Sequence, residues 1–312
     1  MKRLKWLLLG FALGGSLVWG MSEAHASTPF DMNAKSALVV NATTDEVVMG
    51  KNADDVRPIA SITKMMTAIV TLDSQLPLDE VITITTEDVK ATMLHGRPYS
   101  GSLTVGTTLT RSELLHLALM NSQNRAAAAL ARSYPGGTHA FVQAMNAKAL
   151  SIGMMNTHFV DSTGLMSANV STARDLATMA KHAASYEVIQ QMSTSKHLDA
   201  NVRVRNQDRL AHFGTTNRLL KTAHWDIDIQ KTGYINAAGR CLLMVTNVDN
   251  SPFIVVLLNT SSSYHRASDA IKIKSWIETG EVASRSQVAT LNPYNVTAKY
   301  KKQKHKKHKK RR

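Results

Sequence analysis

The order in which β-rich and helical segments follow one another restricts the possible folds of this chain more than any other feature. Two β-rich runs surround the turn "NATTDE" near the beginning of the sequence, which is a hairpin pattern. Three further runs, "WDIDIQKTGYI", "RCLLMVTNV" and "PFIVVLLNT", come late in the chain, and the short turns between them predict an antiparallel meander. Helical patterns occupy the middle. This order predicts an α+β domain in which N- and C-terminal strands share one antiparallel sheet and a helical lobe lies between them.

Apolar periodicity and turn residues locate the helices. After Ser61, apolar residues recur at the spacing of a buried helix face, and they are Ile62, Met65, Met66, Ile69 and Val70. "SELLHLALM" and "NRAAAALARSY" predict two helices joined at "NSQN", and "GGTHAFVQAMNAKALSIG" predicts a third that ends at Gly153. "STARDLATMAKHAASY" predicts a fourth with Ser171 as its N-cap, and "ASDAIKIKSWIETG" predicts a last helix that ends at Gly280.

The first 26 residues have the features of a secretory signal peptide. Three basic residues precede an apolar run at residues 6–20, and the small-x-small site "AHA" ends at Ala26. The run is shorter than the roughly 20 residues that a membrane-spanning helix needs, and an uncleaved anchor is the alternative. We therefore expect secretion. The single cysteine, Cys241, cannot form an intramolecular disulfide, and its place in a β-rich run predicts a buried, inert thiol.

The formal net charge of +14 is concentrated at the C-terminus. The last fourteen residues, "KYKKQKHKKHKKRR", contain ten Lys or Arg and no acidic residue. Because these charges repel one another, the segment is expected to be a disordered tail. It has two possible roles, as a solubilising segment or as a tether to an acidic wall polymer or an anionic membrane surface. A secreted chain does not meet DNA, so nucleic acid is not expected as a partner.

The tetrapeptide "SITK", residues 61–64, carries the first chemical signal. Residues three apart lie on one face of a helix, so the hydroxyl of Ser61 and the amine of Lys64 are within hydrogen-bonding reach. Serine needs a base to become a nucleophile, and lysine can be that base when burial or a second cation lowers its pKa. The alternative role for Ser61 is a helix N-cap, but a capping box has Glu or Gln three residues later, where this chain has Lys64.

Two further motifs follow. "SQN" begins at Ser122, between two predicted helices, where turn chemistry is the alternative explanation. "KTG" begins at Lys231 in a β-rich run, where glycine lets a substrate approach the backbone. "STSK" at 193–196 and "SAN" at 167–169 also match the first two patterns, but no Ser-x-Asn lies between "STSK" and "KTG". Only the set that begins at Ser61 therefore has the order Ser-x-x-Lys, Ser-x-Asn, Lys-Thr-Gly, which is the signature of the penicillin-recognising serine enzymes.

From about Ala37 to Gly280 the sequence resembles the low-molecular-mass penicillin-binding proteins, the D-alanyl-D-alanine peptidases. The segments that carry the likeness are "SITKMMTA", "LPLDE", "LALMNSQNRAAAALA", "YPGG", "AFVQAMNAKA", "NVSTARDL", "QKTGYINAAGRCL" and "WIETG". Two features depart from the family pattern. The middle motif has Gln123 where an acidic or small residue is expected, and the basic tail is not a family feature. The resemblance implies a β-lactamase/transpeptidase-like fold. We expect a catalytic domain at 27–285, and the basic residues beyond it predict a disordered tail at 286–312.

The resemblance also implies a role for each motif residue. Ser61 would attack the carbonyl between two D-alanine-type residues and form an acyl-enzyme, with Lys64 as the base and Ser122 as the proton relay to the leaving amine. Lys231 would bind the substrate carboxylate and keep the pKa of Lys64 low, and it would contact Ser122. The amides of Ser61 and Tyr234 would form the oxyanion hole. The implied substrate-binding residues are Asn124, Lys231, Thr232, Gly233 and Tyr234. No metal or organic cofactor is implied.

The expected activity is that of a periplasmic serine-type D-alanyl-D-alanine endopeptidase, which hydrolyses peptidoglycan cross-links and is inhibited covalently by β-lactams. A class A β-lactamase has the same motifs but needs a glutamate for deacylation, and Glu187 is the only glutamate between Ser122 and Lys231. A D-alanyl-D-alanine carboxypeptidase is the nearer alternative, although such enzymes usually carry an extra β-rich domain and an amphipathic anchor. A non-catalytic wall-binding module is the third.

Overall fold

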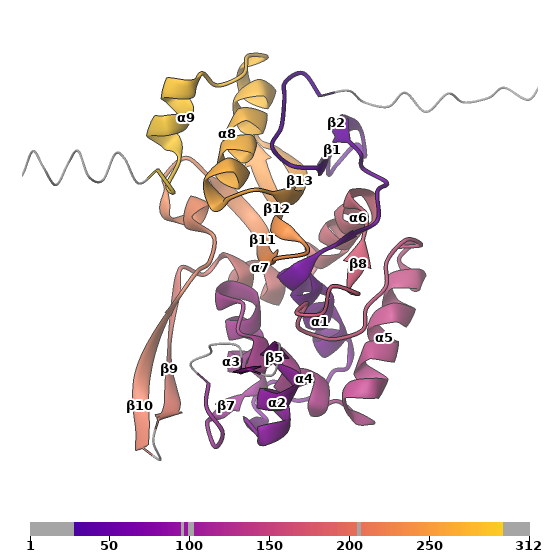
Figure 1. Cartoon of the computed structure of the whole chain (residues 1–312), viewed down its shortest axis with the longest axis vertical. Helices are drawn as coiled ribbons and strands as arrows, with labels where there is room; N and C mark the ends of the chain where they lie inside the picture. Colours follow the sequence, from indigo (N-terminus) through magenta and orange to yellow (C-terminus); the bar gives the residue numbers. More distant parts are fainter. Residues whose placement is uncertain (1–27, 95–96, 99–102, 205–206, 296–312) are drawn as a thin grey trace, which may run out of the picture.

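A five-stranded antiparallel sheet organises the structure, a computed structural model that describes residues 28–94, 97–98, 103–204 and 207–295. The strand order is β11-β12-β13-β1-β2 (Figure 1). The bounds are β1 Ser36–Asn41, β2 Val47–Lys51, β11 Asp226–Ile235, β12 Gly239–Val248 and β13 Ser251–Thr260. The first two strands come from the N-terminal hairpin and the other three from the C-terminal meander. The expectation that both ends of the chain share one sheet is therefore confirmed.

Both faces of this sheet are covered by helices. In β13, Val256 and Leu258 belong to the large core beneath α6 (Ala173–Ala183), whereas Val255 and Leu257 belong to a second core beneath α8 (Ser263–Thr279). Successive side chains of a strand point to opposite faces. A strand that is buried on both faces must therefore be continuously apolar, as the stretch "FIVVLL" of β13 is.

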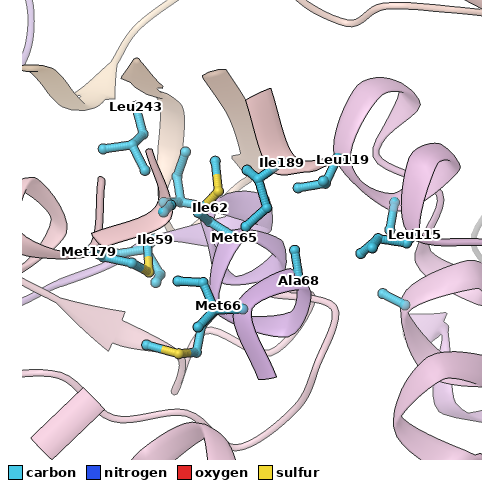
Figure 2. Packing of buried hydrophobic residues seen from close by; sticks show 14 of the residues in the cluster. Ile59, Ile62, Met65, Met66, Ala68, Leu115, Leu119, Met179, Ile189 and Leu243 are labelled. Atoms are coloured by element: carbon cyan, nitrogen blue, oxygen red, sulfur yellow. The ribbon is translucent and has the colours of Figure 1, made fainter. Parts of the chain in front are cut away.

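The helical lobe is built around α1 (Thr63–Asp73), whose residues from Thr63 to Thr71 are all buried. Figure 2 shows apolar side chains from several elements surrounding this helix, among them Leu115, Ile189 and Leu243. The lobe also contains α3 Arg111–His116, the π-helical turn η2 Leu117–Asn121, α4 Asn124–Arg132, α5 Gly137–Ser151 and α7 Glu187–Thr194. Because every face of α1 is packed, the residues at its N-terminal end are fixed in position.

The fold contains several further short elements. They are β3 Arg57–Pro58, η1 Ala60–Ile62, β4 Val81–Thr83, α2 Thr86–Ala91, β5 Met93–Leu94, β6 Arg97–Pro98, β7 Thr108–Thr110, β8 Val170–Ser171 and η3 Arg218–Lys221. Among the described residues, no helix combines the length and the apolar character needed to cross a membrane.

One expected detail is wrong, and several elements, helix α2 among them, were not expected. The N-cap of α6 is Thr172, not Ser171, because the Thr172 hydroxyl accepts the amide of Asp175 at 3.0 Å. Helix α7 and a long hairpin of β9 (His197–Val204) and β10 (Gln207–Gly214) were missed. The hairpin projects from the body of the molecule (Figure 1), and most residues of β10 are exposed. Strand β9, "HLDANVRV", does alternate polar and apolar residues, which is a strand signal, and the prediction overlooked it.

The two ends of the chain lie mostly outside the described residues. This applies to the predicted signal peptide at 1–26 and to residues 296–312 of the predicted tail. The tail boundary expected after residue 285 falls at the start of α9 (Arg285–Leu291), and the described chain continues to Asn295. The prediction of a buried cysteine is confirmed, because Cys241 is fully buried and burial raises the pKa of its thiol to about 11.

Candidate active site

A pocket opens where three chain segments meet: η1 before α1, the turn between η2 and α4, and β11. Six of the eight residues selected from the sequence line it, namely Ser61, Ser122, Asn124, Thr232, Gly233 and Tyr234. The other two, Lys64 and Lys231, are both 0% exposed. The three motifs are far apart in the sequence, and the fold brings them to one place.

Lys64 is placed to act as a base toward Ser61. Its Nζ atom lies 3.0 Å from Ser61 Oγ, 2.7 Å from Asn124 Oδ1 and 2.5 Å from the carbonyl oxygen of Thr163. A neutral amine has two N–H groups, which the Asn124 and Thr163 oxygens accept, so its lone pair is directed at the remaining neighbour, the Ser61 hydroxyl. Burial lowers the pKa of Lys64 to about 7, and the negative charge of Asp161 acts in the opposite direction.

The backbone beside Ser61 is held in an unusual conformation. Ala60 has φ of 49°, which costs about 1–3 kcal/mol for a residue with a side chain. Two glycines pack directly against this backbone. A Cβ atom at Gly233 would lie 3.0 Å from the amide nitrogen of Ser61, and one at Gly164 would lie 2.9 Å from it and overlap the carbonyl of Ala60. Only glycine leaves room at these positions for the turn that presents Ser61.

A loop at residues 161–166 supports both Ser61 and Lys64, and the sequence analysis missed it. The Asp161 carboxylate accepts the backbone amides of Thr163 (2.5 Å), Gly164 (2.6 Å) and Met166 (3.0 Å). These bonds fix the Thr163 carbonyl against Lys64 Nζ and Gly164 against Ala60. The Asx-turn pattern "DSTG" was a visible signal for a turn, but nothing in it indicated contact with "SITK".

The turn of the second motif follows the π-helical η2. Ser122 adopts a left-handed conformation with φ of 64°, and Asn124 is the first residue of α4. Gln123, the departure from the family pattern, donates a hydrogen bond to Asn121 Oδ1 at 2.7 Å and lines the pocket. Among the hydrogen bonds of the described residues, none joins Ser122 to Lys64 or Lys231, so the expected contact of Ser122 with Lys231 remains a prediction.

Lys231 lies beneath the pocket wall. Its Nζ atom donates to the carbonyl oxygen of Thr232 at 2.9 Å. Burial holds the pKa of Lys231 well below its usual value, and the charges of Lys64 and Arg266 lower it further. Two buried ammonium groups in mutual repulsion cannot both keep their protons easily, so the arrangement favours a neutral Lys64 or a neutral Lys231.

The pocket walls contain cations that the motifs did not indicate. Arg125, Arg240 and Arg266 line it, and none of the residues that line it is acidic. The guanidinium of Arg240 lies 3.8 Å from the ring centroid of Tyr234, and Arg266 is only 4% exposed. This electropositive pocket suits an anionic ligand. A single arginine within a helix or strand belongs to no sequence pattern that would predict its position in a pocket wall.

The rejected motif matches have structural roles. Ser193 of "STSK" is buried in α7, where its hydroxyl accepts the amide of Gln230 at 3.3 Å. Asn169 of "SAN" is buried, and its side-chain oxygen accepts the amide of Val160 at 2.7 Å. Glu187 is exposed and accepts a bond from Gln191 at 2.8 Å. None of the three lines the pocket.

Comparisons with known proteins agree on one family. A sequence model described as D-alanyl-D-alanine carboxypeptidase matches residues 22–262. The D-alanyl-D-alanine endopeptidase of Pseudomonas aeruginosa is 43% identical over 81% of this chain and 80% of its own. The enzyme of the same name from Escherichia coli is 42% identical over 88% of this chain and 87% of its own. The crystal structure of the Streptomyces K15 DD-transpeptidase, 30% identical, superposes with a TM-score of 0.73 over 80% of this chain and 98% of that one.

Proposed function

The chain belongs to the D-alanyl-D-alanine carboxypeptidase family of serine peptidases, and from this premise we propose that it hydrolyses the peptide cross-links of peptidoglycan as a D-alanyl-D-alanine endopeptidase. The observation that carries the proposal is the 3.0 Å contact between Ser61 Oγ and the buried amine of Lys64. The endopeptidases of Pseudomonas aeruginosa and Escherichia coli support the choice of reaction, since each is more than 40% identical to this chain.

The proposed reaction begins when neutral Lys64 takes the proton of Ser61 as its Oγ attacks the D-alanine carbonyl. The amides of Ser61 and Tyr234 donate to the oxyanion that forms. When the C–N bond breaks, Ser122 passes a proton to the leaving amine, and the acyl group stays on Ser61. Water then attacks the ester, which releases the carboxylic acid and restores the serine.

The remaining residues of the set hold the substrate in this proposal. The side-chain amide of Asn124 accepts from Lys64 through Oδ1, which leaves its N–H groups for the acyl part of the substrate. The carboxylate on the leaving side lies against the Thr232 hydroxyl and the Arg266 guanidinium, both of which line the pocket. Lys231 is buried beneath Thr232, so its charge attracts the carboxylate from behind the wall.

Digestion of purified muropeptides separates the endopeptidase from the carboxypeptidase alternative. We expect the secreted form of the protein to convert cross-linked dimers to monomers without release of free D-alanine, as read by mass spectrometry. Ser61→Ala is expected to lose this activity and covalent labelling by fluorescent penicillin, because it removes the hydroxyl that lies in the pocket 3.0 Å from the buried amine of Lys64. Release of D-alanine from monomers with intact dimers would establish a carboxypeptidase instead. Equal labelling of wild type and Ser61→Ala would contradict the enzyme proposal and favour the non-catalytic wall-binding module.

We also propose that the chain is exported to the periplasm and that its basic tail binds an acidic partner there. The tail residues 299–312 contain ten Lys or Arg, enough for binding that falls as salt rises. A variant that lacks residues 299–312 is expected to bind purified peptidoglycan sacculi, or vesicles with anionic lipids, more weakly than the full chain in a sedimentation assay. Retention equal to that of the full chain on both would make the tail a solubilising segment.

A further inference from the structure

Tyr294, close to the end of the described chain, has a phenol oxygen that bonds to three groups, two of which belong to the pocket-lining residues Thr216 and Arg266. The hydroxyl donates to the carbonyl oxygen of Thr216 at 3.1 Å. It accepts from the backbone amide of Arg218 at 3.1 Å and from Nη2 of Arg266 at 3.2 Å. The guanidinium groups of Arg218 and Arg266 also lie 5.0 and 5.8 Å from its ring centroid. This one side chain therefore joins a loop before β11 to helix α8.

Thr216, which accepts the hydrogen bond of Tyr294, also contacts residues at the second and third motifs. The amide of Thr216 donates to the carbonyl of Met120 at 3.2 Å, at the end of η2 and just before the "SQN" turn. The Thr216 hydroxyl lies 2.6 Å from that of Thr232 in "KTG". The carbonyl oxygen that Tyr294 holds thus belongs to the residue that links these two motifs.

Arg266, at the other end of this contact, is one of the cations that line the pocket. Nη1 of Arg266 donates to the carbonyl of Cys241 at 3.3 Å, and Nη2 donates to Tyr294. None of the ion pairs between described residues includes Arg266. Its orientation is therefore set by two neutral acceptors, and its charge is left for a ligand.

The segment that carries Tyr294 is itself fixed. Asn292 is 4% exposed, and its side-chain amide donates to the carbonyl of Tyr264 and to Ser268 Oγ, each at 2.9 Å. Its Oδ1 accepts the amide of Tyr294 at 3.0 Å. The segment thus docks on α8, in a region that lies beyond residues 22–262 matched by the family.

We propose that Tyr294 is a positioning residue for the substrate carboxylate, which it aligns through Arg266 and, by way of Thr216, through the hydroxyl of Thr232. The C-terminal segment is then a working part of the active site. This inference rests on the proposed acyl-enzyme chemistry at Ser61, because it assigns the carboxylate site of that same reaction.

Tyr294→Phe tests the inference because it removes the hydroxyl and keeps the ring. The measurement is the second-order rate constant for acylation by a penicillin and by its carboxylate methyl ester, with the melting temperature recorded. We expect Tyr294→Phe to slow acylation by the free acid about 10-fold, since the contacts involve a charged group, and to change the ester rate by much less. Tyr264→Phe is the matched control on the neighbouring helix, and both of its rates should equal those of wild type.

The outcomes are distinct. Equal losses with acid and ester would mean that Tyr294 only supports the fold, and this would overturn the inference. Wild-type rates with both would overturn it as well. If wild type itself fails to form an acyl-enzyme, the proposed function has failed instead. Tyr294→Phe retains the aromatic ring that packs against Arg218 and Arg266, so the folded protein should remain available for measurement.

Discussion

Replacing Lys64 with methionine is expected to lower the rate of Ser61 acylation by about 10²–10⁴-fold, the usual contribution of a general base. Methionine matches the length and apolar body of lysine, so it should fill the fully buried position without a cavity. It cannot accept the proton of Ser61, which lies 3.0 Å from the lysine amine. The measurement is the acylation rate with a fluorescent penicillin, together with the melting temperature to show that the variant is folded.

The chain supplies its own control for this prediction. Lys196 ends the second Ser-x-x-Lys match, but it is exposed and its serine partner Ser193 bonds to Gln230. Lys196→Met should therefore leave acylation unchanged. If a folded Lys64→Met is acylated within threefold of wild type, Lys64 is not the base.

The pKa of Lys64 predicts the pH dependence of acylation. The reaction needs neutral Lys64, whose pKa is about 7, so the rate should rise with pH through about 7 and then level off. The negative charge of Asp161 raises this pKa. In Asp161→Asn the acylation rate is therefore expected to rise at lower pH than in wild type, whether or not the maximal rate also changes. A rise that stays in place in Asp161→Asn would contradict the electrostatic role of this carboxylate.

Gly164→Ala is expected to lower activity by about 10²-fold or more, the cost of moving a reacting group by about 1 Å. The added Cβ would overlap the carbonyl of Ala60 and lie 2.9 Å from the amide nitrogen of Ser61. Both atoms are backbone, so they can give way only if the turn that presents Ser61 moves. Acylation rate and dimer cleavage should fall together, because both reactions use that turn.

Gly153→Ala is a control that distinguishes the steric clash of the added Cβ atom from the backbone strain of a positive φ. Gly153 has φ of +88° and Gly164 has φ of +76°, but a Cβ at Gly153 would meet no atom within 4 Å. Both variants should lose about 1–2 kcal/mol of stability from the left-handed backbone, whereas only Gly164→Ala should lose activity in molecules that remain folded. Equal activity in the two variants would show that the Ala60 turn tolerates the extra methyl group.

The parts of the fold that the sequence predicted are those with local signals. Turn residues and apolar runs identified the strands of the main sheet, and the order of three short motifs selected Ser61 over Ser193. The hairpin of β9 and β10 was missed although β9 alternates polar and apolar residues, because its partner β10 is mostly exposed and has no regular apolar period. At the start of α6, Ser171 and Thr172 are both good N-caps, and only the structure shows that Thr172 has this role.

The missed parts of the site depend on contacts between distant segments. The carbonyl of Thr163 reaches Lys64 across 99 residues of sequence, and Tyr294 reaches Thr216 across 78. Every residue type has a backbone carbonyl, so no sequence motif indicates which one will contact the site. The groups proposed as catalytic could be named from the sequence, whereas the atoms that hold them in place could not.

The position of β1 has a consequence for when this enzyme becomes active. This strand lies between β13 and β2, so a strand made among the first must wait for one made among the last before the sheet can close. Such long-range pairing is slow and cannot begin during early synthesis. Tyr294 follows later still. A growing chain therefore lacks the complete sheet, and with it the β11 wall of the pocket, until most of the protein has been made. This delays the assembly of a wall-cutting activity during synthesis.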